Sequence, residues 1–325
     1  MRSTNTNQLK KWHEEFSVEH PLRLFKKQKE SFLDKIETEL QICNYEVERI
    51  KARHFAIQNR LLLTKCEDPE IVFLAHYDTP TIMPVGFAPL YLLLGHTRQK
   101  IAMVLVVIFS IIFVIIDSFL AHADAGYWLF IYRMVLGLLF LVQFFIPNPH
   151  NAEDNTSGVT GLLSLADWSK DKVFKEKIQF VFLDNEEWGL IGSNALKTIW
   201  KKENHLHEDT LIINLDCISR GDTPLLIYHK EDYLAREIFP FLEAQFPQTK
   251  IINMKKIPLS DNYTFRKRGA VDISFATPAI IPGGFYIPDV HSPKDKGFSP
   301  EKTSHLLDAL ASFVQSKLSE SSNQQ

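Results

Sequence analysis

Histidine and carboxylate side chains follow three apolar segments of the sequence, at the point where each segment ends. His76 and Asp78 close FLAHYD, Glu186 and Glu187 follow FVFLD, and Asp216 closes IINLD. In an open α/β sheet the carboxyl ends of the strands form one edge, where catalytic groups gather. Imidazole nitrogens and carboxylate oxygens, without thiolate, are the ligands of many catalytic zinc sites. The pattern therefore indicates metal-dependent chemistry at this edge.

Two further candidates lie outside these three segments. Asp154 belongs to the polar stretch NAEDNTSGV, and His291 belongs to PDVHSPKD. Each motif alone is weak, because strings such as Asp-Asn-x-Ser-Gly are commonly only turns and adjacent glutamates commonly face solvent. Their joint occurrence with the strand-end residues, in one chain order, favours a functional site.

The rest of the chain alternates between strand and helix patterns. Strands are predicted over 45–65 (a pair), 70–78, 178–184, 210–216, 224–230 and 271–277. Helices are predicted over 31–43, 158–170, 190–202, 232–246 and 299–318, with Ser299 as the N-cap of the last. The alternation predicts an α/β fold with a mixed, mainly parallel central sheet and helices on both faces.

One segment interrupts this alternation. Residues 101–120 and 127–146 are two apolar stretches with one charge each, separated by the short sequence AHADAG. Each stretch is long enough to cross roughly 30 Å of hydrocarbon as a helix. The alternative, a pair of buried core helices, is less favoured because such helices are rarely apolar all round. We therefore expect an inserted two-helix transmembrane hairpin in an integral membrane protein.

The insertion sets the predicted domain organisation. Residues 1–84 form the first part of the catalytic domain, 85–147 the insertion, 148–318 the remainder and 319–325 a polar tail. Basic residues next to a span mark its cytoplasmic side. Arg98 and Lys100 flank the first span and the tip has no lysine or arginine, so the catalytic domain is expected to face the cytoplasm.

Charge and cysteine content narrow the class of protein further. The formal net charge of -3 gives no electrostatic argument for nucleic-acid binding. The three cysteines lack a C-x-x-C motif, which argues against a disulfide framework and fits a reducing compartment. The N-terminal sequence has no apolar region of the kind that a signal peptide needs.

Taken together, the motifs resemble those of the co-catalytic di-zinc aminopeptidases, a family that includes bacterial leucine aminopeptidase, glutamate carboxypeptidase and glutaminyl cyclase. The resemblance covers roughly residues 30–315 without the hairpin, and it implies a zinc exopeptidase-like fold. The matching motifs are HYD from His76, EDNTSG from Glu153, DNEEWGLIGS from Asp184, NLD from Asn214 and HSPKD from His291.

The resemblance also implies a set of metal ligands for two zinc ions. Asp154 would bridge both ions, His76 and Asp216 would complete one set, and Glu187 and His291 would complete the other. A tight turn flanked by asparagine and glycine can bring a carboxylate within reach of both. The two ends of the insertion must then lie close together, because His76 precedes it and Asp154 follows it.

By the same resemblance Glu186 would be the general base, and Asp78 would lie behind His76 and fix its tautomer. The positions i and i+2 on a strand place His76 and Asp78 on one face. Two positions depart from the family pattern: Asn262 stands in SDNYTF where histidine is common, and Val290 stands where some members have an oxyanion-stabilising tyrosine. Tyr286 is a nearby substitute for that tyrosine.

The favoured function is a membrane-anchored, zinc-dependent aminopeptidase that hydrolyses N-terminal peptide bonds. Its expected partners are a peptide substrate and the lipid bilayer, without nucleic acid, while the oligomeric state and the side-chain preference stay open. One alternative is a glutaminyl-cyclase-like acyltransferase, which can retain these ligand types with one zinc. The other is a non-enzymatic membrane-bound binding protein, which the complete set of ligands and base disfavours.

Overall fold

A computed structural model describes residues 5–83, 87–121, 126–143, 145–254 and 260–322. Within these ranges, one sheet is built from β1 to β8 in the spatial order β1-β2-β4-β3-β5-β8-β6-β7, and β9 pairs with β8. The strands are β1 (Val47–His54), β2 (Ile57–Thr64), β3 (Ile71–His76), β4 (Ile178–Leu183), β5 (Leu211–Leu215), β6 (Thr223–Tyr228), β7 (Lys250–Asn253), β8 (Val271–Pro278) and β9 (Phe285–Tyr286).

The centre of the sheet is parallel and its flanks are mixed. Strands β4, β3, β5 and β8 run parallel to one another, whereas β2 pairs with β4 and β6 pairs with β8 in antiparallel fashion. All residues of β3, β4 and β5 are buried, as expected for strands covered on both faces. The predicted mixed α/β fold with a central sheet is therefore confirmed.

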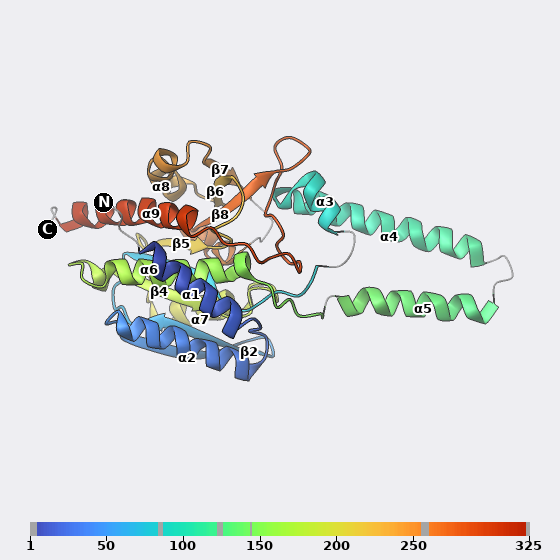
Figure 1. Ribbon diagram of the computed structural model, residues 1–325, viewed down its shortest axis with the longest axis horizontal. Coiled ribbons are helices and arrows are strands. Elements are labelled where there is room, and N and C mark those ends of the chain that lie inside the picture. The colour runs from blue at the N-terminus through green and yellow to red at the C-terminus, as the bar shows by residue number, and fades with distance from the viewer. Residues whose placement is uncertain (1–4, 84–86, 122–125, 144, 255–259, 323–325) are drawn as a thin grey trace.

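Helices cover both faces of this sheet (Figure 1). The helices are α1 (Thr6–Glu19), α2 (Lys26–Ile42), α6 (Gly158–Ser169), α7 (Ile191–Glu203), α8 (Tyr233–Gln245) and α9 (Pro300–Ser322), with short turns η3 (Lys175–Lys177) and η4 (Asp261–Arg268). Along β3, Phe73 and Ala75 pack in the larger core with α1, α2, α6, α8 and α9, while Val72 and Leu74 pack in the core beneath α7. This two-residue alternation follows from the pleat of the strand.

Helices α1 and α9 are among the elements that differ from the sequence-based expectation. Helix α1 was not predicted. Asn5 caps this helix by accepting a hydrogen bond from the Gln8 backbone N–H at 3.2 Å, and the helix buries Trp12 and Phe16. Helix α9 continues to Ser322, beyond the expected start of a polar tail at residue 319, and residues 323–325 lie outside the described ranges.

The insertion between β3 and α6 has a root, two long arms and a neck. The root contains α3 (Phe87–Leu94) and η1 (His96–Arg98), and the arms are α4 (Gln99–Ala121) and α5 (Gly126–Gln143). In Figure 1 both arms extend away from the α/β body in the same direction. Many of their apolar side chains are exposed, among them Phe109 on α4 and Leu138 on α5.

The neck brings the outgoing and returning chains together. The Ile82 N–H donates to the Ile146 carbonyl at 2.8 Å, the Asn148 N–H donates to the Pro80 carbonyl at 3.0 Å, and Thr81 forms an antiparallel bridge with Pro147. The expectation that the ends of the insertion lie close together is thus confirmed.

The expected transmembrane hairpin is wrong. Across the described residues, none of the helices combines the length and the hydrophobicity that crossing a membrane requires. Helix α5 has 18 residues, about 27 Å at 1.5 Å per residue, which is shorter than the roughly 30 Å of a hydrocarbon core. The assignment as an integral membrane protein with two transmembrane helices is corrected accordingly, and the argument for a cytoplasmic face, which depended on it, is withdrawn. Residues 122–125 of the predicted tip are outside the described ranges.

Candidate metal centre

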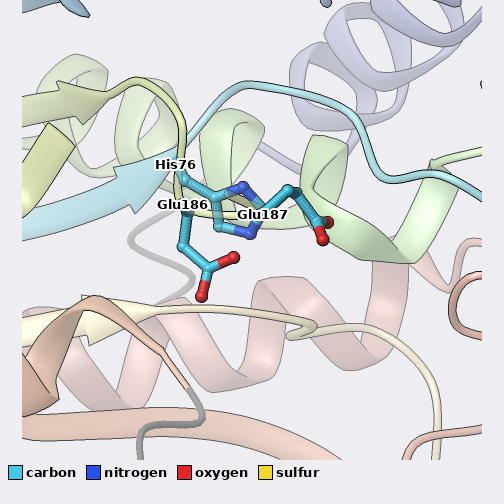
Figure 2. A group of neighbouring side chains, drawn as sticks. All are labelled: His76, Glu186 and Glu187. Carbon is cyan, nitrogen blue, oxygen red and sulfur yellow. The ribbon is translucent and has the colours of Figure 1, made fainter. Parts of the chain in front are cut away.

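The candidate residues meet at the carboxyl ends of the central parallel strands. His76 is the last residue of β3, Glu186 and Glu187 follow β4 by three and four residues, and Asp216 directly follows β5. Figure 2 shows the His76 ring at the end of its strand with the carboxylates of Glu186 and Glu187 on either side. The parallel register of β3 with β4 and β5 brings these three strand ends to one edge.

Asp154 lies between the two histidines. Its Oδ1 is 3.2 Å from His76 Nε2, and its Oδ2 is 2.9 Å from His291 Nε2. The two oxygens of one carboxylate therefore face two different imidazoles, which is the arrangement that a bridging ligand needs.

Two groups of potential ligands share this carboxylate. One group is His76, Asp154 and Asp216, and the other is Asp154, Glu187 and His291, each with its ligand atoms within 4.8 Å of one another. In the first group His76 Nε2 is 3.6 Å from Asp216 Oδ1, and in the second His291 Nε2 is 3.3 Å from Glu187 Oε2. The structure brings together all five residues that the sequence had assigned as ligands, and it divides them into the same two sets.

Asp78 contacts both the histidine and the glutamates. Its Oδ1 lies 3.6 Å from His76 Nδ1 and accepts a hydrogen bond from the Glu186 N–H at 3.0 Å, while its Oδ2 accepts from the Glu187 N–H at 3.3 Å. The expected place behind His76 is observed, although 3.6 Å is too long for a hydrogen bond. The contacts with the glutamate backbone were not expected, and they fix the segment that carries Glu186.

Buried hydrogen bonds also fix the loop that carries Asp154. Asp295 accepts hydrogen bonds from the Glu153 and Asp154 N–H groups at 2.8 and 3.1 Å. The Asn155 side chain donates to the Leu215 carbonyl at 2.9 Å and accepts from the Cys217 N–H at 3.2 Å. The loop is thereby tied to β5, and this explains why asparagine follows the aspartate in EDNTSG.

The charges in the site attract a cation. Burial lowers the pKa of His76, but the carboxylates of Asp154, Asp216 and Asp78 outweigh burial and raise that pKa well above its usual value. Asp154 raises the pKa of His291 in the same way against the effect of burial. Burial raises the pKa of Asp154, yet the two imidazoles hold it well below its usual range. A divalent cation can supply the positive charge that protonated imidazoles otherwise provide.

The glutamates behave differently from Asp154. Burial, with neighbouring carboxylates, raises the pKa of both Glu186 and Glu187 well above the usual value. Glu187 Oε1 is buried without a hydrogen-bond partner among the described residues, as expected for an atom that awaits a ligand. The nitrogen and oxygen donors, their grouping and this unpaired oxygen fit a zinc-type metal centre.

The centre opens into a cavity of about 710 Å³. This volume lies within the range of sites that hold drug-sized ligands. Carboxylates dominate its charged lining: Asp154, Glu186, Glu187, Asp216 and Asp272. Val290 also lines the cavity, whereas Tyr286 is not among the described residues that do, so it is not placed to replace the missing tyrosine. The Asn262 side chain donates to the Ile227 carbonyl at 3.0 Å and so has a structural contact.

Two buried charged residues near the centre, Arg23 and Asp261, were missed as site residues. Arg23 is fully buried and donates hydrogen bonds to Asn151 Oδ1 and Thr156 Oγ1 at 2.8 and 2.9 Å. Burial lowers the pKa of Arg23 to about 9, although the carboxylates of Asp78 and Asp154 act to raise it. Its segment, HPLRLF, carries no local signal for such a role. Asp261 is a different case, because it stands in the recognised SDNYTF segment. Burial raises its pKa to about 7.

Comparison with known proteins agrees with this geometry. Residues 119–314 match peptidase family M28, which is more than half of the chain, and the chain therefore belongs to this family. No curated protein matches the sequence. The matched range contains Asp154, Glu187, Asp216 and His291 but begins after His76.

Solved structures show the same fold at low sequence identity. The Legionella pneumophila LapA aminopeptidase is similar with a TM-score of 0.62 at 11% identity, over 95% of this chain and 71% of that one. A Zn-dependent exopeptidase from Parabacteroides distasonis has a TM-score of 0.63 at 12% identity, over 95% and 97% of the two chains. The Porphyromonas gingivalis glutaminyl cyclase has a TM-score of 0.65 at 14% identity, over 98% and 100%.

Proposed function

We propose that this protein is a zinc-dependent aminopeptidase that removes residues from the N-terminus of peptides. One observation carries the proposal: Asp154 presents one oxygen to His76 and the other to His291, so that two groups of potential ligands share it. One carboxylate placed in this way would be able to hold two metal ions. Membership of a peptidase family supports a hydrolase.

The residues suggest how a peptide bond would be cleaved. His76 and Asp216 would hold one zinc, Glu187 and His291 the other, with Asp154 between them. Zinc bound there lowers the pKa of water toward neutrality and polarises a carbonyl group. Glu186 lies next to Glu187 but outside the two ligand groups that share Asp154, and it would accept the proton of the attacking water and return it to the leaving amine.

Glutaminyl cyclisation is the second candidate. The fold is shared with glutaminyl cyclases as well as with an aminopeptidase, so the fold does not separate the two reactions. In that reaction the substrate's own α-amine attacks the side-chain amide of an N-terminal glutamine and ammonia leaves. No water is consumed, and Glu186 would carry the proton from the attacking amine to the leaving ammonia.

One experiment separates these functions. The purified protein is incubated with a panel of aminoacyl amides and with peptides that begin with glutamine, and bound metal is measured on the same sample. We expect two zinc ions per chain and release of free amino acids. Conversion of glutamine peptides to pyroglutamyl peptides without amino-acid release would instead establish the cyclase. Absence of both reactions at full metal occupancy would reject both.

A further inference from the structure

The root of the insertion forms one wall of the cavity at the metal centre. Phe87, Tyr91, His96 and Gln99 line this cavity together with Asp154, Glu186, Glu187, Asp216 and His291. All four wall residues belong to α3, η1 or the first residue of α4. The insertion therefore contributes directly to the space that a substrate would occupy.

Hydrogen bonds fasten this wall to the segment that leads to His291. The N–H groups of Ile280 and Ile281 donate to the Leu92 and Leu93 carbonyls at 3.1 and 2.9 Å. Gly95 has a φ of +85°, and a Cβ there would lie 2.4 Å from the Phe285 backbone nitrogen, so this close approach requires glycine. The position of the wall is thus fixed relative to the metal centre.

His96 has a defined tautomer in this wall. Its Nδ1 accepts a hydrogen bond from the Ile287 N–H at 3.1 Å, and its ring stacks on Tyr91 with centroids 4.2 Å apart. Burial lowers the pKa of His96 to about 3, so the ring is neutral at pH 7. A neutral imidazole that accepts at Nδ1 carries its proton on Nε2, which is then a donor.

This donor is left without an acceptor. His96 Nε2 is buried and has no hydrogen-bond partner among the described residues, and the same holds for Gln99 Oε1, an acceptor on the same wall. A buried polar group without a partner is costly, and native proteins keep few of them. A backbone amide offers a carbonyl oxygen that can accept from such a donor and an N–H that can donate to such an acceptor.

Building on the proposed peptidase function, we infer that His96 and Gln99 bind the backbone amide that follows the scissile bond of a peptide substrate. His96 Nε2–H would donate to the carbonyl oxygen of this amide, and Gln99 Oε1 would accept from its N–H. The scissile amide itself would lie beside the residues that would hold the metal ions. The remaining cavity is large enough for the next residue, since 710 Å³ exceeds what one aminoacyl group fills.

Two substitutions at position 96 separate the proposed contact from the structural one. His96→Asn keeps an acceptor at the place of Nδ1 for the Ile287 N–H but removes the group at Nε2. His96→Gln keeps a donor at the place of Nε2 but removes the acceptor at Nδ1. Gln99→Leu removes the acceptor at similar size, and His54→Phe at the distant end of β1 is the control.

The substrates are trialanine, which has a second amide, and alanine 4-nitroanilide, which has only the scissile one. We expect His96→Asn and Gln99→Leu each to raise KM for trialanine about tenfold, because each removes one hydrogen bond from substrate binding. The kcat for trialanine, the zinc content and the kinetics with the nitroanilide should not change. His96→Gln, which keeps a donor at the place of Nε2, should raise this KM less than His96→Asn does, and the distant control His54→Phe should stay near wild type. Equal losses on both substrates, loss in His96→Gln but not in His96→Asn, or no loss in any variant would overturn the inference.

A binding measurement keeps this test independent of the proposed reaction. Calorimetry of trialanine with zinc-loaded Glu186→Gln protein, with and without His96→Asn, should show about tenfold weaker binding in the double variant. If wild-type protein cleaves neither substrate but this difference is found, the proposed aminopeptidase function fails while the amide site stands. If both proteins bind trialanine equally, the amide site is rejected whatever the activity.

Discussion

The metal centre and the arms of the insertion are built in opposite ways. At the centre, polar groups are buried and held by named partners, as Asp154 is by the Asp295 hydrogen bonds and Asp78 by the backbone of Glu186 and Glu187. In the arms α4 and α5, apolar side chains such as Phe109 and Leu138 are exposed. The centre is determined by many mutual contacts, whereas the arms are largely independent of the body.

The root of the insertion belongs with the centre rather than with the arms. Tyr91 and Leu94 are buried in a small cluster with Ala102, and the root lines the cavity. The boundary between the parts that matter for catalysis and those that do not therefore runs through the insertion, near the start of α4. Four experiments test this division.

The largest effect is expected from Asp154→Ala, which removes the carboxylate shared by both ligand groups. We expect loss of both zinc ions, measured by metal analysis. Activity should fall by more than about 100-fold, which is the loss expected when only a hydrogen-bond partner of a metal ligand is removed. His291→Ala, which removes a residue of one group only, should chiefly lower one of the two occupancies. Two zinc ions at full occupancy in Asp154→Ala would contradict the bridging role.

Glu186→Gln is expected to lower kcat by at least about 100-fold while both zinc ions remain, because general-base catalysis is lost and no proposed ligand is removed. The matched variant is Glu187→Gln at the adjacent position, which should lose zinc as well as activity. Near-normal turnover by Glu186→Gln would assign the proton transfer to another group.

A third experiment uses pH to test how firmly the centre is packed. His13 lies on α1, and its Nε2 is 2.8 Å from the Ala152 carbonyl oxygen. Its ring stacks on that of Phe298 with the centroids 3.7 Å apart. Burial lowers the pKa of His13 to about 4. The unfolded chain then binds more protons than the folded one between pH 6.5 and 4. Stability is therefore lost as the pH falls through this window.

From pH 7 to pH 5 this loss should amount to about 2 kcal/mol, a factor of roughly 30 in the folding equilibrium. It is measured by urea unfolding of the metal-free protein. His13→Gln cannot titrate but keeps a donor for Ala152, so it should lack this part of the pH dependence. Parallel stability curves for the two proteins would show that His13 titrates normally.

The smallest effect is expected from shortening the arms. Replacing residues 106–140 by a Gly/Ser linker keeps the root, the neck and the packed residues Ala102 and Leu105. We expect kcat/KM to stay within about threefold of wild type, because none of the described residues among those removed lines the cavity. Extending the deletion to residues 87–145 removes His96 and Gln99 and should weaken tripeptide binding. Inactivation by the shorter deletion at normal zinc content would refute the division drawn above.

The site could be predicted from sequence because its constraints are local and numerous. His76 stands at the end of an apolar strand, and Asp154 stands in the EDNTSG motif. In both places the sequence shows the residue type together with the backbone position that the fold requires. The arms offered only hydrophobicity, and that single property led to the incorrect transmembrane prediction. His96 and Gln99 could not be found, because their significance depends on unpaired atoms, and these are set by contacts between segments about 190 residues apart, such as that of His96 with Ile287.

The neck has a consequence for how this chain can change over evolutionary time. Because Thr81 and Pro147 pair beside the centre, the chain between them is a closed loop whose ends are fixed whatever its length. Doubling a flexible loop adds only about 0.6 kcal/mol of closure entropy. Lengthening, trimming or exchanging the arms would then leave the ligand geometry intact.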